Sequence, residues 1–238
     1  PRGLEAALAA ELGRLGAHAV APVDGGVGFE GPLELAYVVN LESRLASRVL
    51  WKVGGGPYRD ERELNALARG IDWPTHFRAD RTIRVDVAAT RSPLRSLEFA
   101  TLTVKDAVCD RFRDEQGKRP SVDKRMPDVR VHAYLTDREA TFYLDTSGEP
   151  LFKRGYRRDT DEAPLRENLA AGLLALAGWT PDAPFLDPMC GSGTIAVEAA
   201  LIAADRAPGL ARTFGFQKLA WFDGPAWQRM KQTARDRI

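Results

Sequence analysis

The chain has 238 residues, enough for one or two domains with a sizeable core. Hydrophobic residues make up 44% and charged residues 28%, which is ordinary for a soluble globular protein, and no apolar run approaches the roughly 18 residues of a membrane helix. The formal net charge of +1 predicts no general affinity for polyanions, and two distant cysteines argue against a disulfide framework, so we expect a cytoplasmic protein.

The first 55 residues predict a small α+β unit. Leucines at helical spacing indicate its first helix, and a turn at Asp24-Gly25-Gly26 indicates a pair of strands. The expected elements are helices over 4–15 and 32–41 and strands over 17–23, 26–31 and 46–53. This order matches a ferredoxin-like unit whose first strand precedes Pro1.

Residues 56–147 predict a second α+β unit. A helix over 60–69, a strand over 81–89 and a long helix over 96–112 precede a hairpin over 129–148. In the hairpin, apolar side chains alternate with polar ones on both sides of a turn at Asp137-Arg138.

A domain boundary is predicted at 148–163, where glycines, a proline and dense charge interrupt the pattern. A helix then runs from Pro164 to near Gly178, an apolar strand ends at Asp187, and an alanine-rich helix extends to about Asp205. A final helix follows the break at Pro208-Gly209, so 164–238 is the last unit.

The loop "DPMCGSGT" between that strand and helix is the strongest ligand-binding signal. No lysine follows Gly193, which excludes a Walker phosphate loop. A hydrolase elbow needs glycines two residues before and two residues after its serine, and around Ser192 those positions hold Cys190 and Thr194. Gly191 to Ala196 fits the dinucleotide pattern G-x-G-x-x-A, but the expected acidic second strand is missing.

S-adenosylmethionine is the ligand that this loop favours, because it carries an ammonium and a carboxylate but no phosphate. Asp187 suits the ammonium, glycine backbone allows close approach, and a helix N-terminus suits the carboxylate. The competing interpretation is a glycine turn that only packs a strand on a helix. The predicted cofactor-binding residues are Asp187, Pro188, Met189, Cys190, Gly191, Ser192, Gly193 and Thr194.

Several motifs together resemble the THUMP-containing class I methyltransferases, in particular the bacterial enzymes that modify guanine N2 of large-subunit (23S) ribosomal RNA. They occur in order as "SRLASRVL", "VKDAVCDRF", "RPSVD", "PDVRVHAYL", "LDTSG", "KRGYR" and "LDPMCGSGT". The resemblance implies a ferredoxin-like unit, an RNA-binding THUMP domain over 56–147 and the start of a Rossmann-like α/β methyltransferase domain. It also implies S-adenosylmethionine as cofactor and ribosomal RNA as partner.

The family's Asn-Pro-Pro-aromatic catalytic motif is absent, because none of the three asparagines precedes proline. We therefore expect no catalytic residue in this chain, an incomplete methyltransferase domain, and the N-terminal part of a larger enzyme. An RNA-binding module without activity, a transfer-RNA methyltransferase of the same group and, more distantly, a nicotinamide enzyme are the alternatives.

Basic residues cluster in two places that could contact RNA. The first cluster interleaves cations with aromatic rings, as single-stranded RNA contacts do, although a solvated linker would look similar. The second is diluted by acids and fits an ordinary solvated loop as well. The predicted RNA-binding residues are Lys153, Arg154, Tyr156, Arg157 and Arg158 in the first cluster and Lys118 and Arg119 in the second. His18, His76 and His132 share no spacing, so no metal site is expected.

Overall fold

The computed structural model describes residues 2–157 and 165–238, and the chain divides into two compact units. The first unit comprises Pro1–Val49, Glu149–Thr213 and Asp223–Ile238, and the second comprises Leu50–Gly148 and Phe214–Phe222. Each unit is thus assembled from segments that lie far apart in the sequence.

The second unit is built on a four-stranded sheet in the order β3-β6-β5-β4. The strands are β3 (Leu50–Pro57), β4 (Ile83–Ala89), β5 (Val129–Leu135) and β6 (Glu139–Asp145). β6 pairs antiparallel with β3 and with β5, whereas β4 and β5 are parallel. The β5–β6 hairpin forms as predicted, because its apolar positions alternate with polar ones and one face of the sheet is buried.

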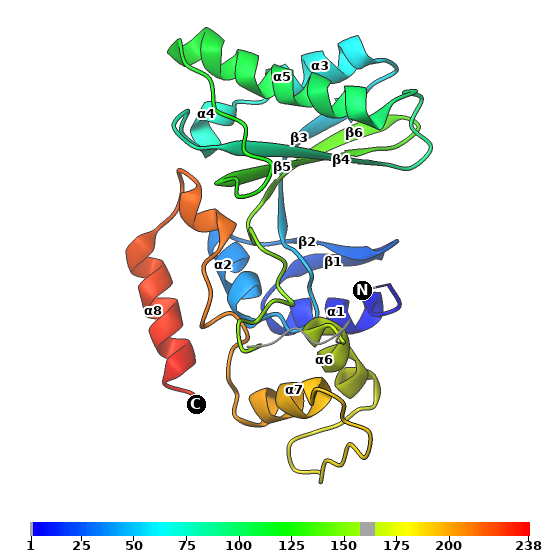
Figure 1. Cartoon of the computed structure of the whole chain (residues 1–238), viewed down its shortest axis with the longest axis vertical. Helices are drawn as coiled ribbons and strands as arrows, with labels where there is room; N and C mark the ends of the chain where they lie inside the picture. Colours follow the sequence, from blue (N-terminus) through cyan, green and yellow to red (C-terminus); the bar gives the residue numbers. More distant parts are fainter. Residues whose placement is uncertain (1, 158–164) are drawn as a thin grey trace. The chain divides into compact units, whose positions relative to one another are not determined.

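Helices α3 (Glu61–Gly70) and α5 (Leu97–Gln116) lie together on one face of this sheet (Figure 1). The short α4 (Trp73–His76) was not predicted. α5 begins at Ser96, whose side chain accepts a hydrogen bond from the amide of Phe99, and ends at Gly117 in the left-handed conformation (φ 67°). The rings of Phe77 and Phe112 pack in the core at a tilt of 48°, with centroids 4.9 Å apart.

A late segment, Phe214–Phe222, completes the second unit. It contains the 3₁₀ helix η1 (Gly215–Lys218). The amide of Phe216 donates to the carbonyl of Thr146 at 2.9 Å, and the Trp221 ring lies 5.6 Å from the Trp51 ring. The aromatic residues of this loop therefore serve packing.

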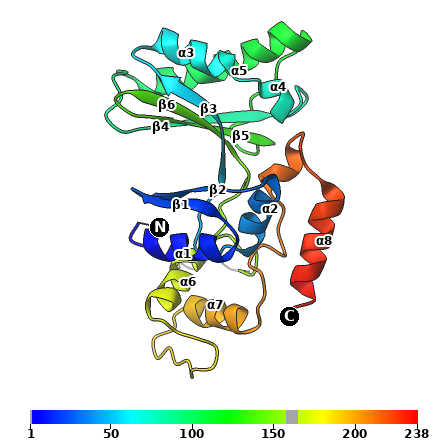
Figure 2. The same ribbon diagram turned by 180° about the vertical axis from the view of Figure 1, so that it is seen from behind.

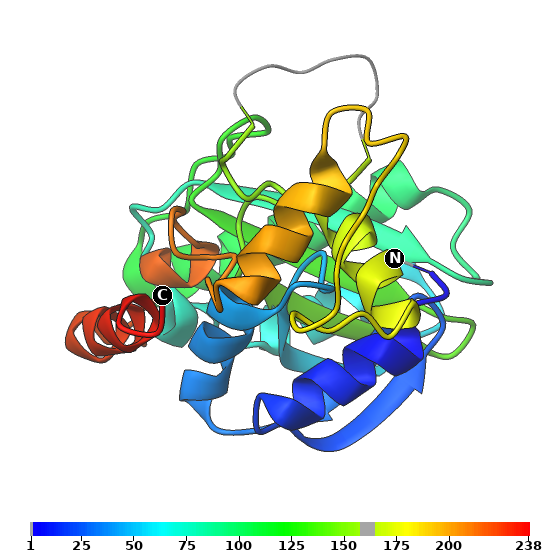
Figure 3. The same cartoon turned by 90° about the horizontal axis from the view of Figure 1, so that it is seen from below.

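Over its described residues, the first unit combines five helices with one hairpin. Its elements are α1 (Glu5–Arg14), β1 (His18–Val23), β2 (Gly26–Glu30), α2 (Leu33–Glu42), α6 (Glu167–Leu176), α7 (Thr194–Ala203) and α8 (Gly224–Arg235). α6 lies beside both α1 and α7, as the views from behind and below show (Figures 2 and 3). Leu4, the residue before α1, packs closely on Gly172 of α6, because a Cβ at Gly172 would lie 2.3 Å from a methyl of Leu4.

Two predicted strands differ from the structure. The strand expected over 46–53 begins at Leu50 and pairs with β6, so it belongs to the sheet of the second unit. The strand expected before Asp187 does not form: its residues are irregular and Leu186 is 85% exposed. A strand needs a neighbour for its amides and carbonyls, and no described strand borders this segment.

Candidate functional site: the loop before α7

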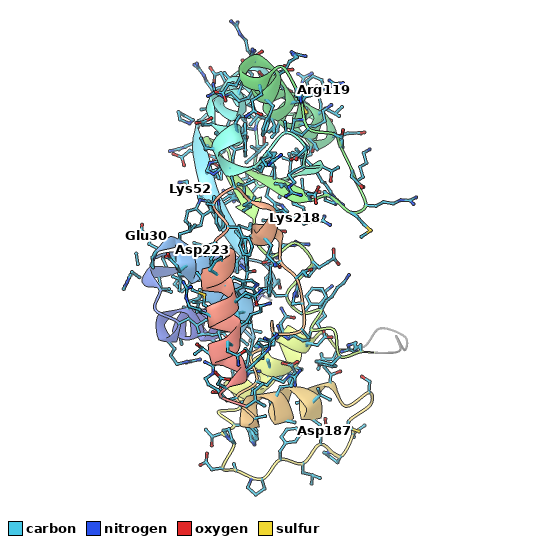
Figure 4. The ribbon with its side chains drawn as sticks, turned by 90° about the vertical axis from the view of Figure 1, so that its left-hand side faces the viewer. Glu30, Lys52, Arg119, Asp187, Lys218 and Asp223 are labelled. Carbon is cyan, nitrogen blue, oxygen red and sulfur yellow. The ribbon has the colours of Figure 1, made fainter. Side chains whose placement is uncertain are left out.

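The loop 187–194 is a continuous, largely exposed turn that leads into α7 (Figure 4 labels Asp187). The Asp187 carboxylate accepts a hydrogen bond from the amide of Met189 at 3.2 Å, and the amide of Gly193 donates to the carbonyl of Cys190 at 2.8 Å. These two local turns present the backbone of the loop to solvent.

Gly191 and Gly193 both adopt positive φ angles, +52° and +73°. Other residues rarely take this conformation without strain. A Cβ on either glycine would meet no atom within 4 Å, so the space beside the loop backbone is open. A ligand can therefore approach the backbone closely at both glycines.

The N-terminus of α7 has no side-chain cap. The first intrahelical bond here is donated by the amide of Val197 to the carbonyl of Gly193 at 2.9 Å. The amides at 194–196 consequently lack intrahelical partners, and their partial positive charge suits an anion.

Most predicted cofactor-binding residues lie at the surface. Met189 is 91% exposed, and Pro188, Cys190, Gly191 and Ser192 are also exposed. Thr194 differs, because it is only 4% exposed and its hydroxyl lies 3.2 Å from that of Ser192. The Thr194 side chain therefore points into the protein rather than toward solvent.

The predicted RNA-contacting residue Arg154 is buried, with 4% of its surface exposed. Its guanidinium donates to the carbonyls of Leu151 at 2.8 Å and Arg44 at 2.6 Å. Its Nε lies 3.6 Å from Glu198 Oε1. This guanidinium is enclosed by backbone carbonyls and a carboxylate, so it does not reach the surface where RNA would bind.

Glu198, one turn into α7, is completely buried. Burial raises the pKa of its carboxyl, although the charge of Arg154 opposes this rise. The hydroxyl of Tyr156 donates to Glu198 Oε1 at 3.2 Å, and burial together with the charge of Glu198 raises the pKa of Tyr156. Sequence reasoning missed Glu198, whose only signal is a single acid in the apolar run "TIAVEAALIA".

Arg157 is half-buried and lies beside the loop 187–194. Its Nε donates to Glu167 Oε1 at 2.8 Å, and its Nη2 donates to the carbonyl of Leu165 at 2.6 Å and to Thr194 Oγ1 at 3.0 Å. Lys153, by contrast, is exposed and pairs with Glu149 at 2.7 Å. The predicted contact Arg158 lies outside the described residues.

Lys118 and Arg119 are exposed in the loop that follows α5 in the second unit (Figure 4 labels Arg119). A cavity of about 370 Å³ opens there, and its lining includes Arg119, Lys105 and Cys109. Lys105 and Arg119 give this hollow two cations, and Asp106, which also lines it, pairs with Lys105 at 2.7 Å.

Within 2–157 and 165–238, no three His, Cys, Asp or Glu side chains gather in a way that could hold a metal ion. Over the same residues, every helix is too short or too polar to cross a bilayer. His132 instead lies 3.6 Å from the Asp145 carboxylate within the sheet.

Comparison with known families accounts for nearly the whole chain. The RlmL ferredoxin-like domain matches residues 1–50, the THUMP domain matches 58–145, and the RMKL-like methyltransferase domain matches 154–238. The predicted succession of an α+β ferredoxin-like and THUMP region and the start of an α/β methyltransferase domain is confirmed at the level of these families and of related structures.

A similar protein is the ribosomal RNA large subunit methyltransferase K/L of Psychromonas ingrahamii, 46% identical over 98% of this chain and 31% of its own length. The chain thus spans about a third of the curated relatives it matches.

Several solved structures superpose over the whole chain, among them the following two. A protein of Listeria monocytogenes, described as a predicted N6-adenine-specific DNA methylase, superposes with a TM-score of 0.90 at 33% identity, over 62% of its own length. The methyltransferase SMU.472, solved in complex with SAH, superposes with a TM-score of 0.88 at 33% identity, over 63% of its own length. The three regions of the chain thus match, in order, the RlmL ferredoxin-like domain, the THUMP domain and the RMKL-like methyltransferase domain, and large-subunit K/L methyltransferases are similar to it over nearly its whole length.

Proposed function

We propose that this chain is the RNA-recognition and cofactor-binding part of an S-adenosylmethionine-dependent methyltransferase that modifies guanine N2 in large-subunit ribosomal RNA. The observation that carries the proposal is the open glycine loop before the uncapped N-terminus of α7, with Asp187 at its start. Support comes from the K/L relatives and from SMU.472, whose structure holds the cofactor product S-adenosylhomocysteine.

Each polar end of the cofactor has a suitable partner in this loop. The Asp187 carboxylate would attract the ammonium of the methionine part. The amides at 194–196 would receive the carboxylate, because a helix N-terminus favours anions. The open backbone at Gly191 and Gly193 leaves room for the sulfonium and its substituents. Pro188, Met189, Cys190 and Ser192 would line the same loop.

For RNA, the exposed cations Lys118, Arg119 and Lys153 are the contacts that we propose. Tyr156 and Arg157 are only half-buried, but their polar atoms already have protein partners. Arg154 is better assigned to structure, given its burial. Binding through phosphates should weaken steeply as salt rises, because each neutralised phosphate releases counterions.

We further propose that these 238 residues do not transfer a methyl group by themselves. Methyl transfer to a weakly basic exocyclic amine depends mainly on holding both reactants in line. The element that would hold the guanine, Asn-Pro-Pro-aromatic, has no counterpart in the sequence. Such an enzyme would work in the cytoplasm, where ribosomal RNA is assembled.

Calorimetric titration of the protein with S-adenosylmethionine, S-adenosylhomocysteine and NAD tests the cofactor. We expect the first two ligands to bind and NAD not to bind. Binding of RNA without either adenosyl ligand would favour the alternative of a pure RNA-binding module. Comparing ribosomal with transfer RNA in filter binding at several salt concentrations separates the remaining substrate classes.

A further inference from the structure

The hydroxyl of Thr194 is where the loop 187–194 meets a group of buried charges. Arg157 Nη2 donates to it at 3.0 Å while Arg157 Nε donates to Glu167 at 2.8 Å. Thr194 and Glu167 are 4% and 5% exposed, and the Arg157 side chain is 21% exposed. One planar guanidinium therefore joins the start of α6 to the start of α7.

An arrangement of this kind is a weak source of stability. Removing a carboxylate and a guanidinium from water costs free energy that their attraction repays only in good geometry. The geometry is good here, because the same guanidinium also donates to the carbonyl of Leu165 at 2.6 Å. A planar fork with three acceptors in fixed directions defines a position better than a single flexible contact does.

The Arg157 guanidinium holds the end of the loop 187–194, which has few other side-chain contacts with the protein. Gly191 and Gly193 carry no side chains, and the space beside them is open. Fixing the backbone of each flexible residue costs about 1–2 kcal/mol, so a loop that is ordered before its ligand arrives binds more tightly. Thr194 follows Gly193 directly and is the first residue of α7, so holding its hydroxyl fixes both the loop end and the helix amides.

We propose that Arg157, oriented by Glu167, is a positioning residue for the cofactor loop and acts through the hydroxyl of Thr194. This inference rests on the proposed function. Within the loop, Asp187 and the backbone at 191–194 would then contact the ligand, whereas the Thr194 side chain contacts Arg157 inside the protein. Arg157, which sequence patterns assign to RNA, then serves the cofactor.

The test measures S-adenosylmethionine affinity by calorimetry in the wild type, four variants of Arg157 and Thr194, and one control variant. We expect Arg157→Gln to weaken binding about 5- to 20-fold, less than the loss of a charge-assisted hydrogen bond made directly to the ligand, because Arg157 acts only through Thr194. Thr194→Val, which keeps the shape but removes the hydroxyl, should weaken it to a similar extent, and Thr194→Ser should restore most of the loss. The double variant Arg157→Gln/Thr194→Val should be close to the weaker single variant, because both changes remove one contact.

Arg59→Gln is the matched control, since Arg59 forms an exposed ion pair with Glu63 outside the loop. Its affinity should equal that of the wild type. The inference is overturned if Arg157→Gln binds like the wild type, or if the two changes multiply in the double variant. If Arg157→Gln does not fold, the Thr194→Val and Thr194→Ser pair decides: equal affinity of these two overturns the inference. Absence of binding in the wild type itself would instead overturn the proposed function.

Discussion

The sheet of the second unit buries its apolar side chains, whereas the loop before α7 in the first unit exposes them to solvent. Val131, Phe142 and Leu144 are fully buried under α3 and α5. Leu186 and Met189, although apolar as well, are 85% and 91% exposed. The sheet gains stability from buried area, whereas the loop keeps open backbone where a ligand can bind.

A second contrast lies within the first unit, between the exposed loop and the charges behind it. Four charged residues are buried or half-buried around α6 and α7: Arg154, Arg157, Glu167 and Glu198. Buried charges tolerate little displacement, because each needs its partners in place. The loop 187–194 is thus open at Gly191 and Gly193, while Thr194 at its end is hydrogen-bonded to Arg157.

The largest expected effect comes from breaking that support. Arg154→Met should destabilise the protein by about 3–5 kcal/mol, because it leaves the Glu198 carboxylate buried without its cation. The neighbouring Lys153→Met changes an exposed pair and should stay within about 0.5 kcal/mol. Urea unfolding of both variants measures this difference. Similar stabilities would mean that Arg154 is accessible, as an RNA contact would be.

The same chemical change should have very different effects in the two regions. Leu144→Ala in the sheet should cost about 2–5 kcal/mol, because it leaves a cavity in the core. Leu186→Ala before the loop should cost less than about 0.5 kcal/mol, because that side chain is already in water. Equal losses in thermal or urea unfolding would show that the segment before Asp187 is packed.

These contrasts also explain which features the sequence could predict. The β5–β6 hairpin and α5 carry their periodic patterns and their turn or cap residues locally, so they were predicted closely. The strand expected before Asp187 depends on neighbouring strands, which local composition does not encode. The partners of Arg154 and Arg157 lie on α2, α6 and α7 or beside them, so their burial could not be read from the cluster "KRGYR".

Within the loop, Asp187→Ala should weaken S-adenosylmethionine binding by about 1.5–3 kcal/mol, the usual scale for a charge-assisted hydrogen bond. Asp182→Ala, a change to an exposed acid a few residues earlier, is the control and should leave the affinity unaltered. Calorimetry of both variants gives the comparison. Wild-type affinity in Asp187→Ala would remove this carboxylate from the site.

The smallest effect is a pH dependence from Glu198. Burial raises the pKa of the Glu198 carboxyl above its ordinary value of 4.5. As the pH rises from 4.5 to this raised pKa, the carboxyl therefore keeps its proton in the folded protein but loses it in the unfolded chain. The unfolding free energy contributed by this group is therefore highest below pH 4.5 and falls until the raised pKa is passed. The unfolding free energy of the wild type minus that of Glu198→Gln should decrease as the pH rises above 4.5. A constant or rising difference in urea unfolding would contradict a raised pKa.

The central claim is that the open loop before α7 is a cofactor cradle that is already in place. Amide hydrogen exchange followed by mass spectrometry, with and without saturating S-adenosylmethionine, tests it most directly. We predict that the ligand slows exchange at 190–197 and leaves 117–125, the basic loop of the second unit, unchanged. Protection confined to any other segment, with exchange at 190–197 unaltered, would contradict the account.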